Sequence, residues 1–461
     1  MKNLPQDFQT EITQLLGEQE ASQLFRAITD STPPVSVRMN PMKTTENMPF
    51  PLVESVPWCN RWGRYLAERP KFTYDPLLHA GCYYVQEASS MFIAKAYEKI
   101  ASDFQPLCLL DLCAAPGGKS TLWRSLLPDT SLLVANEPIR QRAQILAENL
   151  TKWGHPNVVT TSAYPNDFSS LGSFFDVIAA DVPCSGEGMF RKDDGAIEEW
   201  SAEAVTNCAA RQWEIIASVW PALREGGYLV YSTCTFNREE NEDNVWRICH
   251  ELGAELVPLD TEDDWGIMGD TTNRGLPVYH FFPHKVKGEG LFLALLRKTS
   301  EAPLKKNKKN KKKTSSPKQT AIKDAAKLAK WLDDAAQYDL LPYGEGLVTA
   351  ICSDWTEMVK MVMQTVRTLT AGIALAEEKG RKLIPQHALA LSHVCYKEAF
   401  PRVELSLNEA LSYLRREAIV LPMDVAKGYV IATYKGHALG FLNNLGNRAN
   451  NLYPQEWRIR N

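Results

Sequence analysis

The sequence lacks several features that would point to particular classes of protein. None of its ten cysteines are in C-x-x-C spacing, so it contains neither a zinc motif nor a dithiol redox motif. No apolar run approaches the ~18 residues that a membrane span needs. Residues 1–7 contain no apolar core of a secretory signal. We therefore expect a cytoplasmic chain that spans no membrane, holds no metal and keeps its thiols reduced.

An excess of charge of one sign is also missing. The 51 Lys and Arg residues against 55 Asp and Glu give a net charge of −4, which by itself argues against a nucleic-acid binder. The distribution is uneven, with −13 on residues 1–300, +7 on 301–320 and +2 on 321–461. Residues 305–313 contain seven lysines, which cannot pack because like charges repel. They predict a solvated linker that either binds phosphates or only tethers two regions.

Strand-like and helix-like segments alternate over residues 105–298. Apolar runs typical of buried strands lie at 107–112, 131–136, 157–160, 174–180 and 228–232. Helical segments lie at 121–127, 138–153, 201–223 and 239–251. This alternation predicts a parallel α/β sheet covered on both faces. The runs 279–282 and 291–296 predict an antiparallel hairpin that closes the sheet.

Such a sheet binds its ligands at the carboxyl ends of the strands. Gly117 and Gly118 follow the first strand, where they let a ligand approach the backbone and open a helix N-terminus. Glu137 ends the second strand about 20 residues later, the position from which a carboxylate reaches ribose hydroxyls. Together they predict a cofactor that contains adenosine.

Three cofactors of this kind compete. A nicotinamide site needs G-x-G-x-x-G, which is absent. A P-loop needs G-x-x-x-x-G-K-S; Gly118, Lys119 and Ser120 match its end, but Cys113 replaces its first glycine. S-adenosylmethionine needs no phosphate cradle and is favoured. A P-loop-like ATPase remains the alternative from another class.

Two thiols also lie at neighbouring strand ends, Cys184 after the fourth strand and Cys234 after the fifth. Carbon 5 of a pyrimidine is a poor nucleophile, but a thiolate that adds to carbon 6 makes it able to accept a methyl group. A thiol near pKa 8.5 needs stabilisation to ionise, which Lys119 could supply. Asp181 could hydrogen-bond the ring nitrogens. The competing interpretation of each cysteine is a small buried hydrophobe.

Four ordered motifs resemble the Sun family of RNA cytosine-C5 methyltransferases. They are YVQEASS at 84–90, CAAPGGK at 113–119, DVPCSGEG at 181–188 and YSTCT at 231–235. The resemblance covers residues 75–300, and within the family the chain is most similar to the RsmF type, which acts on small-subunit ribosomal RNA. It implies a Rossmann-like class I methyltransferase core that uses S-adenosylmethionine. A tRNA substrate and a non-catalytic RNA-binding assembly factor remain as alternatives.

The resemblance also implies individual roles. Cys234 would be the nucleophile and Cys184 would assist product release, whereas the chemistry alone leaves the two interchangeable. Glu137 would bind the ribose, and Asp181 would lie near both cofactor and base. Asp167 is the only carboxylate available for an adenine contact after the third strand, with Ala163 and Tyr164 as alternatives for that position. The methionine end of the cofactor would be wrapped by Cys113, Ala114, Ala115, Pro116, Gly117, Gly118 and Lys119.

The remaining regions flank this core. Residues 1–74 form an N-terminal extension with a helical pattern at 8–24 and aromatic and basic side chains between Trp58 and Tyr65, which either stack on unpaired bases or pack internally. Residues 321–461 predict a separate α+β region, with a helix near 321–336 and a hairpin over 429–442. This region resembles a PUA-like RNA-binding module. Arg191 and Lys192 could contact phosphate. We expect a monomer that binds ribosomal RNA.

Overall fold

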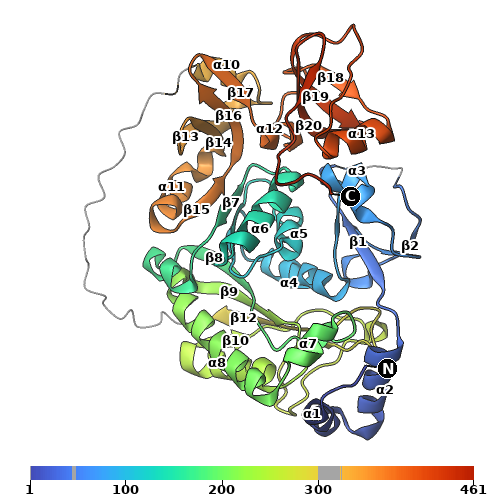
Figure 1. Ribbon diagram of the computed structural model, residues 1–461. Helices are drawn as coiled ribbons and strands as arrows, with labels where there is room; N and C mark the ends of the chain where they lie inside the picture. Colours follow the sequence, from blue (N-terminus) through green and yellow to red (C-terminus); the bar gives the residue numbers. More distant parts are fainter. Residues whose placement is uncertain (1, 44–47, 300–321, 323, 461) are drawn as a thin grey trace.

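A computed structural model describes residues 2–43, 48–299, 322 and 324–460 of the chain (Figure 1). The lysines of 305–313, expected to form the linker, lie outside the described residues. Among the helices in these ranges, none is both long and apolar enough to cross a bilayer.

A nine-stranded sheet forms the centre of the molecule (Figure 1). Its strands follow the order β10-β12-β9-β8-β5-β6-β7-β15, and β11 also pairs with β12. Strands β5 to β9 pair in parallel, whereas β10, β11, β12 and β15 are antiparallel to their partners. The bounds are β5 Cys108–Asp111, β6 Leu132–Asn136, β7 Val158–Thr161, β8 Phe175–Asp181, β9 Leu223–Thr233, β10 Ala254–Leu256, β11 Tyr279–Phe281, β12 Leu291–Lys298 and β15 Thr368–Ala371. The predicted parallel sheet and its antiparallel closure are confirmed.

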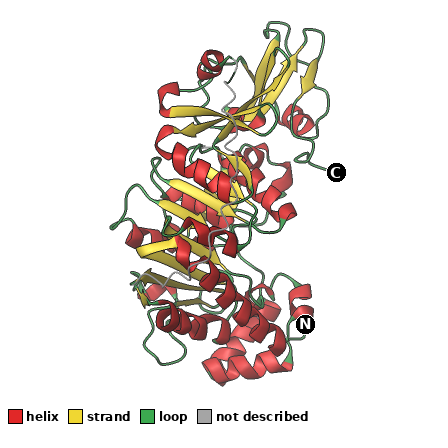
Figure 2. Cartoon of the chain, turned by 90° about the vertical axis from the view of Figure 1, so that its left-hand side faces the viewer, coloured by secondary structure: helices red, strands yellow, loops and turns green. Residues whose placement is uncertain are grey.

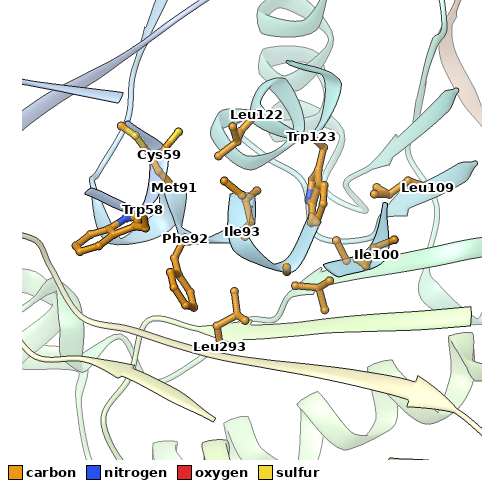
Figure 3. Packing of buried hydrophobic residues seen from close by; sticks show 14 of the residues in the cluster. Trp58, Cys59, Met91, Phe92, Ile93, Ile100, Leu109, Leu122, Trp123 and Leu293 are labelled. Carbon is orange, nitrogen blue, oxygen red and sulfur yellow. The ribbon is translucent and has the colours of Figure 1, made fainter. Parts of the chain in front are cut away.

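Helices cover both faces of this sheet, as its apolar strands require. On one face, Ile93 of α4 and Trp123 of α5 pack with Leu109 and Leu293 of the sheet (Figure 3). On the other face, α8, α9 and α11 contribute to a second core. The helices of the two faces are α4 Ile93–Ile100, α5 Gly118–Leu126, α6 Arg140–Trp153, α8 Ala202–Val219, α9 Asn244–Leu252 and α11 Thr356–Thr365. The short α7 (Asp194–Glu199) has no buried residue.

The N-terminal region combines three helices with a four-stranded sheet of order β2-β3-β1-β4. The helical pattern expected over 8–24 is present, but it is divided between two helices. Gly17 has a φ of +80°, which ends one helix and starts the next, so two helices form. The elements are α1 Gln6–Leu16, α2 Glu18–Asp30, α3 Pro76–His79, β1 Val35–Met39, β2 Leu52–Ser55, β3 Gly63–Leu66 and β4 Tyr83–Val85.

The C-terminal region contains two four-stranded sheets at the end of the molecule opposite the N-terminal helices (Figure 2). The predicted hairpin is present as β19 and β20, joined by Lys435 and Gly436 at positive φ, as a tight two-residue turn requires. The helix expected over 321–336 is much shorter, at 325–329. The elements are α10 Ala325–Ala329, α12 His387–Leu391, α13 Leu407–Leu414, β13 Tyr338–Tyr343, β14 Leu347–Cys352, β16 Ile373–Lys379, β17 Lys382–Pro385, β18 Arg402–Glu404, β19 Gly428–Tyr434, β20 His437–Asn444 and β21 Ala449–Asn451.

The C-terminal region also completes the central sheet. Strand β15 pairs with β7 and covers the backbone groups of what would otherwise be an exposed sheet edge. A region expected to stand apart therefore supplies a strand to the central sheet. The segment is too short and too polar for the sequence pattern to reveal this pairing.

Both flanking regions also cap the carboxyl end of α6, whose last carbonyls need donors from outside the helix. Asn40 Nδ2 donates to the Trp153 carbonyl at 3.1 Å, and Lys43 Nζ donates to that of Lys152 at 2.5 Å. From the C-terminal region, Ser392 Oγ donates to the Gly154 carbonyl at 3.2 Å. One helix end thus holds both flanking regions against the central sheet.

Asn40→Ala should lower the free energy of unfolding by about 2 kcal/mol, because two buried carbonyls, of Gly81 and Trp153, lose their donor. Urea unfolding followed by circular dichroism would measure this. The exposed Asn166→Ala is the control and should change stability little. A loss below about 0.5 kcal/mol in Asn40→Ala would contradict a role for this contact in holding the regions together.

Candidate active site

The site lies where three parallel strands end side by side. Strands β5, β8 and β9 are neighbours, with Asp111 beside Ala179 and Asp181 beside Ser232 in the pairing register. The loops that follow them carry the glycine segment and the two cysteines. The shared sheet edge therefore brings together segments far apart in the sequence.

The two cysteines meet, as predicted. Cys184 Sγ lies 3.0 Å from Cys234 Sγ, and the Cys234 backbone N–H donates to Cys184 Sγ at 3.4 Å. All ten cysteines of the chain are unpaired thiols, and these two are partly exposed rather than buried. The hydrogen bond with Cys234, together with desolvation by the protein around the sulfur, raises the pKa of Cys184 well above its ordinary value. Cys184 therefore keeps its proton beside the sulfur of Cys234.

Lys119 forms an ion pair with Asp181 next to this thiol pair. Its Nζ lies 2.8 Å from Asp181 Oδ2, and the other carboxylate oxygen accepts from Ser232 Oγ at 2.8 Å. Burial alone would lower the pKa of Lys119, but the charge and hydrogen bond of Asp181 outweigh it, so the pKa is raised. The charge of Cys234 acts in the same direction. Lys119 is thus an ammonium fixed by Asp181 beside the thiol pair.

Two buried carboxylates, which the sequence analysis missed, hold the cysteine loops against each other. Glu187 accepts from the backbone N–H groups of Phe236 and Asn237, at 2.7 and 3.1 Å. Glu240 accepts from the backbone N–H of Ser185 at 3.1 Å and from Gln212 Nε2 at 2.6 Å. Each carboxylate therefore ties one cysteine loop to the other.

Both carboxylates share one amide group. Asn237 Nδ2 donates to Glu187 Oε1 at 3.0 Å and to Glu240 Oε1 at 2.8 Å. The pKa of Glu240 is raised to about 7, with burial as the largest cause. The hydrogen bonds with Ser185 and Asn237 act against this rise, and the charge of Glu187 adds to it. The sequence contained one signal for these polar residues, because Glu187 and Asn237 each come three residues after one of the two cysteines.

The segment 113–119 wraps the end of β5 and opens α5. Gly117 has a φ of +116°, and the carbonyls of Ala115 and Pro116 accept from Arg142 at 3.2 Å and Asn149 at 2.8 Å. A Cβ on Gly118 would lie 3.2 Å from the ring of Tyr84, so no larger residue is comfortable there. The loop thus keeps open backbone at a helix N-terminus, which fits the close approach of a cofactor.

Glu137 and Asp167 lie at the next two strand ends. Glu137 is 2% exposed, accepts from the Ile139 N–H at 3.0 Å and pairs with Arg142 at 3.2 Å. That arginine is half exposed, and a ribose contact by Glu137 stays a prediction. Asp167 is exposed, but one of its carboxylate oxygens accepts from the Tyr164 N–H at 2.9 Å. An adenine contact by Asp167 stays a prediction.

Some residues expected at an RNA surface are structural. Arg191 is 8% exposed and donates to Glu289 at 3.0 Å, so it is not free to contact phosphate. Trp58 and Tyr65 are buried, and the Trp58 indole donates to the Ala88 carbonyl at 2.7 Å. Packing against the catalytic core is therefore the correct interpretation of these two aromatic residues. Lys192 remains partly exposed beside Glu289.

The sheet order, with an antiparallel strand inserted beside the fifth parallel strand, and the loop at 113–119 define a Rossmann-like methyltransferase that uses S-adenosylmethionine. Three family models match the chain. They describe the 16S rRNA methyltransferase RsmB/F over 103–297, the N-terminal domain of 16S rRNA methyltransferase RsmF over 4–88, and the RsmF PUA domain over 400–459.

Named relatives and solved structures agree with these family models. The chain is 32% identical to ribosomal RNA small subunit methyltransferase F of Erwinia tasmaniensis over 98% of its own length and 96% of that protein. A methyltransferase homolog from Pyrococcus horikoshii, of known crystal structure, matches with 26% identity and a TM-score of 0.54, covering 64% of this chain and 95% of that one. NSun6 from the same organism, solved with SFG, shares the fold at 20% identity and a TM-score of 0.55, over 65% and 99%. The chain belongs to the RsmF family of ribosomal RNA methyltransferases.

Asn237→Ala should lower the free energy of unfolding by about 3 kcal/mol near pH 8, because two buried carboxylates lose their shared donor. The loss should be smaller near pH 6. Burial raises the pKa of Glu240 to about 7, so the cost of its ionised form is absent at low pH and grows as the pH rises through 7. Urea unfolding at the two pH values would measure both. An equal loss at both would contradict the electrostatic part of the explanation.

Proposed function

We propose that the chain methylates carbon 5 of a cytosine in 16S ribosomal RNA through a covalent bond between Cys234 and carbon 6 of the base. The observation that carries this proposal is the pair of thiols 3.0 Å apart at adjacent strand ends, next to a fixed ammonium. Two thiols in contact have no evident use in a transfer to nitrogen or oxygen, which are already nucleophilic. They suit the activation and later release of an unreactive carbon.

The reaction divides between the two cysteines. The Cys234 thiolate adds to carbon 6, and the electron pair of the carbon 5–carbon 6 double bond moves to carbon 5, which takes the methyl group. S-adenosylmethionine supplies that group when bound. A base then removes the carbon 5 proton, the double bond re-forms and the thiolate leaves. Cys184, kept as a thiol by its raised pKa, donates a hydrogen bond to the departing sulfur.

The surrounding residues bind and orient the reactants. Residues 113–119 would hold the methionine end of the cofactor, Glu137 its ribose and Asp167 its adenine. Asp181, fixed by Lys119 and Ser232, would hydrogen-bond the polar edge of the base. Lys119 would favour the Cys234 thiolate over the thiol before attack.

The flanking regions would supply RNA affinity. We assign this role to the N-terminal extension of residues 1–74 and to the PUA-like region of 321–461, with 75–300 as the catalytic domain and 301–320 as a basic linker between them. Unpaired thiols throughout the chain suit a reducing cytoplasm. We also propose that the enzyme works as a monomer, because all the groups of the reaction come from one chain.

Cys234→Ala should lower methyl transfer at least about 10³-fold and abolish the covalent adduct, because the nucleophile is lost. Cys184→Ala should instead accumulate a protein–RNA adduct that survives a denaturing gel, because expulsion of Cys234 slows. Labelled S-adenosylmethionine and small-subunit RNA from a deletion strain provide the assay. Cys208→Ala is the control and should behave as wild type. An adduct with Cys234→Ala, or free turnover by Cys184→Ala, would show that the roles are assigned wrongly.

Deletion of the gene should leave at least one cytosine of 16S ribosomal RNA unmethylated, and the purified enzyme should restore it. Bisulfite sequencing of ribosomal and transfer RNA from both strains would measure this. If the ribosomal cytosines are unchanged and a tRNA cytosine loses its methyl group, the tRNA substrate replaces the ribosomal one.

A further inference from the structure

A groove of about 500 Å³ lies between the N-terminal region and the catalytic core, outside the residues assigned to catalysis and to the cofactor. Its walls come from residues 32–36, residues 85–87, Arg69 and the pair Arg191–Lys192. Pro33, Pro34, Val35 and Val85 give it apolar surface, and Arg69 and Lys192 add cationic groups, whereas the charge of Arg191 is paired with Glu289. A polyanion with flat apolar faces matches this lining.

The groove adjoins the active site on two sides. On one side, Gln86 Nε2 lies 3.9 Å from where a Cβ of Gly118 would stand, directly before Lys119. On the other, Arg191 follows three residues after Gly188, whose N–H donates to the Cys234 carbonyl at 2.7 Å. The groove therefore adjoins both the loop at 113–119 and the loop that carries Cys184.

Gln86 presents a hydrogen-bond donor that the protein does not use. The side chain is 5% exposed, and its Oε1 accepts from Arg38 Nε at 2.6 Å. Arg38 is itself buried and bonded to Thr121 Oγ1 at 2.6 Å, so it fixes which way the amide points. Nε2 has no partner among the described residues. A buried donor without a partner is costly, which favours an acceptor supplied by a ligand.

Of the three basic residues that line the groove, Arg191 and Lys192 both pair with Glu289, and only Arg69 has no carboxylate partner among the described residues. Glu87 is its only lining carboxylate among the described residues, and it already accepts from the backbone N–H groups of Ser89, Ser90 and Glu289, at 2.8–2.9 Å. Arg69 is exposed and forms no ion pair with the described carboxylates; its guanidinium lies 5.6 Å over the ring of Phe72. Lys192 is 32% exposed at its side chain and 3.3 Å from Glu289.

We propose that this groove binds the stretch of RNA next to the target nucleotide, an inference that rests on the proposed site of RNA methylation. Arg69 and Lys192 bind successive phosphates at its rim. Gln86 Nε2 donates to a sugar or base oxygen of the nucleotide beside the target, and the prolines and valines pack against that nucleotide. The groove thereby orients the RNA so that the target base enters the site over Cys234.

Arg69→Ala and Lys192→Ala test the phosphate contacts. Each should weaken the binding of small-subunit RNA from a deletion strain about fivefold at moderate salt. Each should also reduce the slope of log affinity against log salt by about 1. Arg69→Lys should keep the slope, because the charge remains. Arg26→Ala on α2, an exposed arginine outside the groove, is the matched control. Filter binding across a salt series gives these values.

Gln86→Leu tests the unused donor, with circular dichroism to confirm that the variant folds. It should weaken RNA binding with the salt slope unchanged and leave the affinity for S-adenosylmethionine as in wild type. If Gln86→Leu instead weakens S-adenosylmethionine binding and spares RNA, the donor belongs to the cofactor and the groove proposal is wrong. If Arg69→Ala and Lys192→Ala bind RNA like wild type while wild type still methylates it, the groove proposal is wrong and the proposed function is retained. If wild type transfers no methyl group to RNA, the proposed function fails by itself.

Discussion

The shared amide of Asn237 is the contact on which the geometry of the active site depends. Two loops that end neighbouring strands each carry a cysteine, and parallel pairing alone brings these loops only near each other. Glu187 and Glu240 are buried, so each must find donors, and the donors are backbone N–H groups of the loops themselves. Satisfying these carboxylates therefore fixes the loops, and the fixed loops hold the two sulfur atoms in contact.

The same logic applies at the other end of the sheet. The carboxyl end of α6 exposes carbonyls that the helix cannot satisfy, and side chains of both flanking regions satisfy them. Because β15 also joins the sheet edge, the C-terminal region is held by backbone pairing as well as by side chains. The parts expected to bind RNA are thereby anchored to the strands that carry the chemistry. If the flanking regions bind RNA as proposed, this anchoring would let those contacts orient a base over Cys234.

Sequence reasoning recovered what local pattern encodes. The five parallel strands and their buried runs were predicted, and so were the meeting of Cys184 with Cys234 and the glycine loop at 113–119, because strand ends and turns have strong local signals. Which cysteine attacks did not follow from the residues, since both occupy equivalent strand ends. The carboxylate pair was missed because burial of Glu187 and Glu240 depends on partners from other loops. The role of Trp58 was left open between stacking and packing, since only tertiary packing distinguishes a buried aromatic side chain from a stacking platform.

The net charge of −4 now has a physical interpretation. At physiological salt, charges farther apart than about 8 Å are largely screened, so a phosphate responds to the side chains beside it rather than to the whole chain. The cationic side chain near the thiols is Lys119, and those along the groove are Arg69 and Lys192. The carboxylates of Glu87 and Glu240 already accept hydrogen bonds from backbone N–H groups. An acidic catalytic half is therefore compatible with an RNA substrate, because buried carboxylates such as Glu187 and Glu240 are occupied in holding the loops and cationic side chains lie at the site.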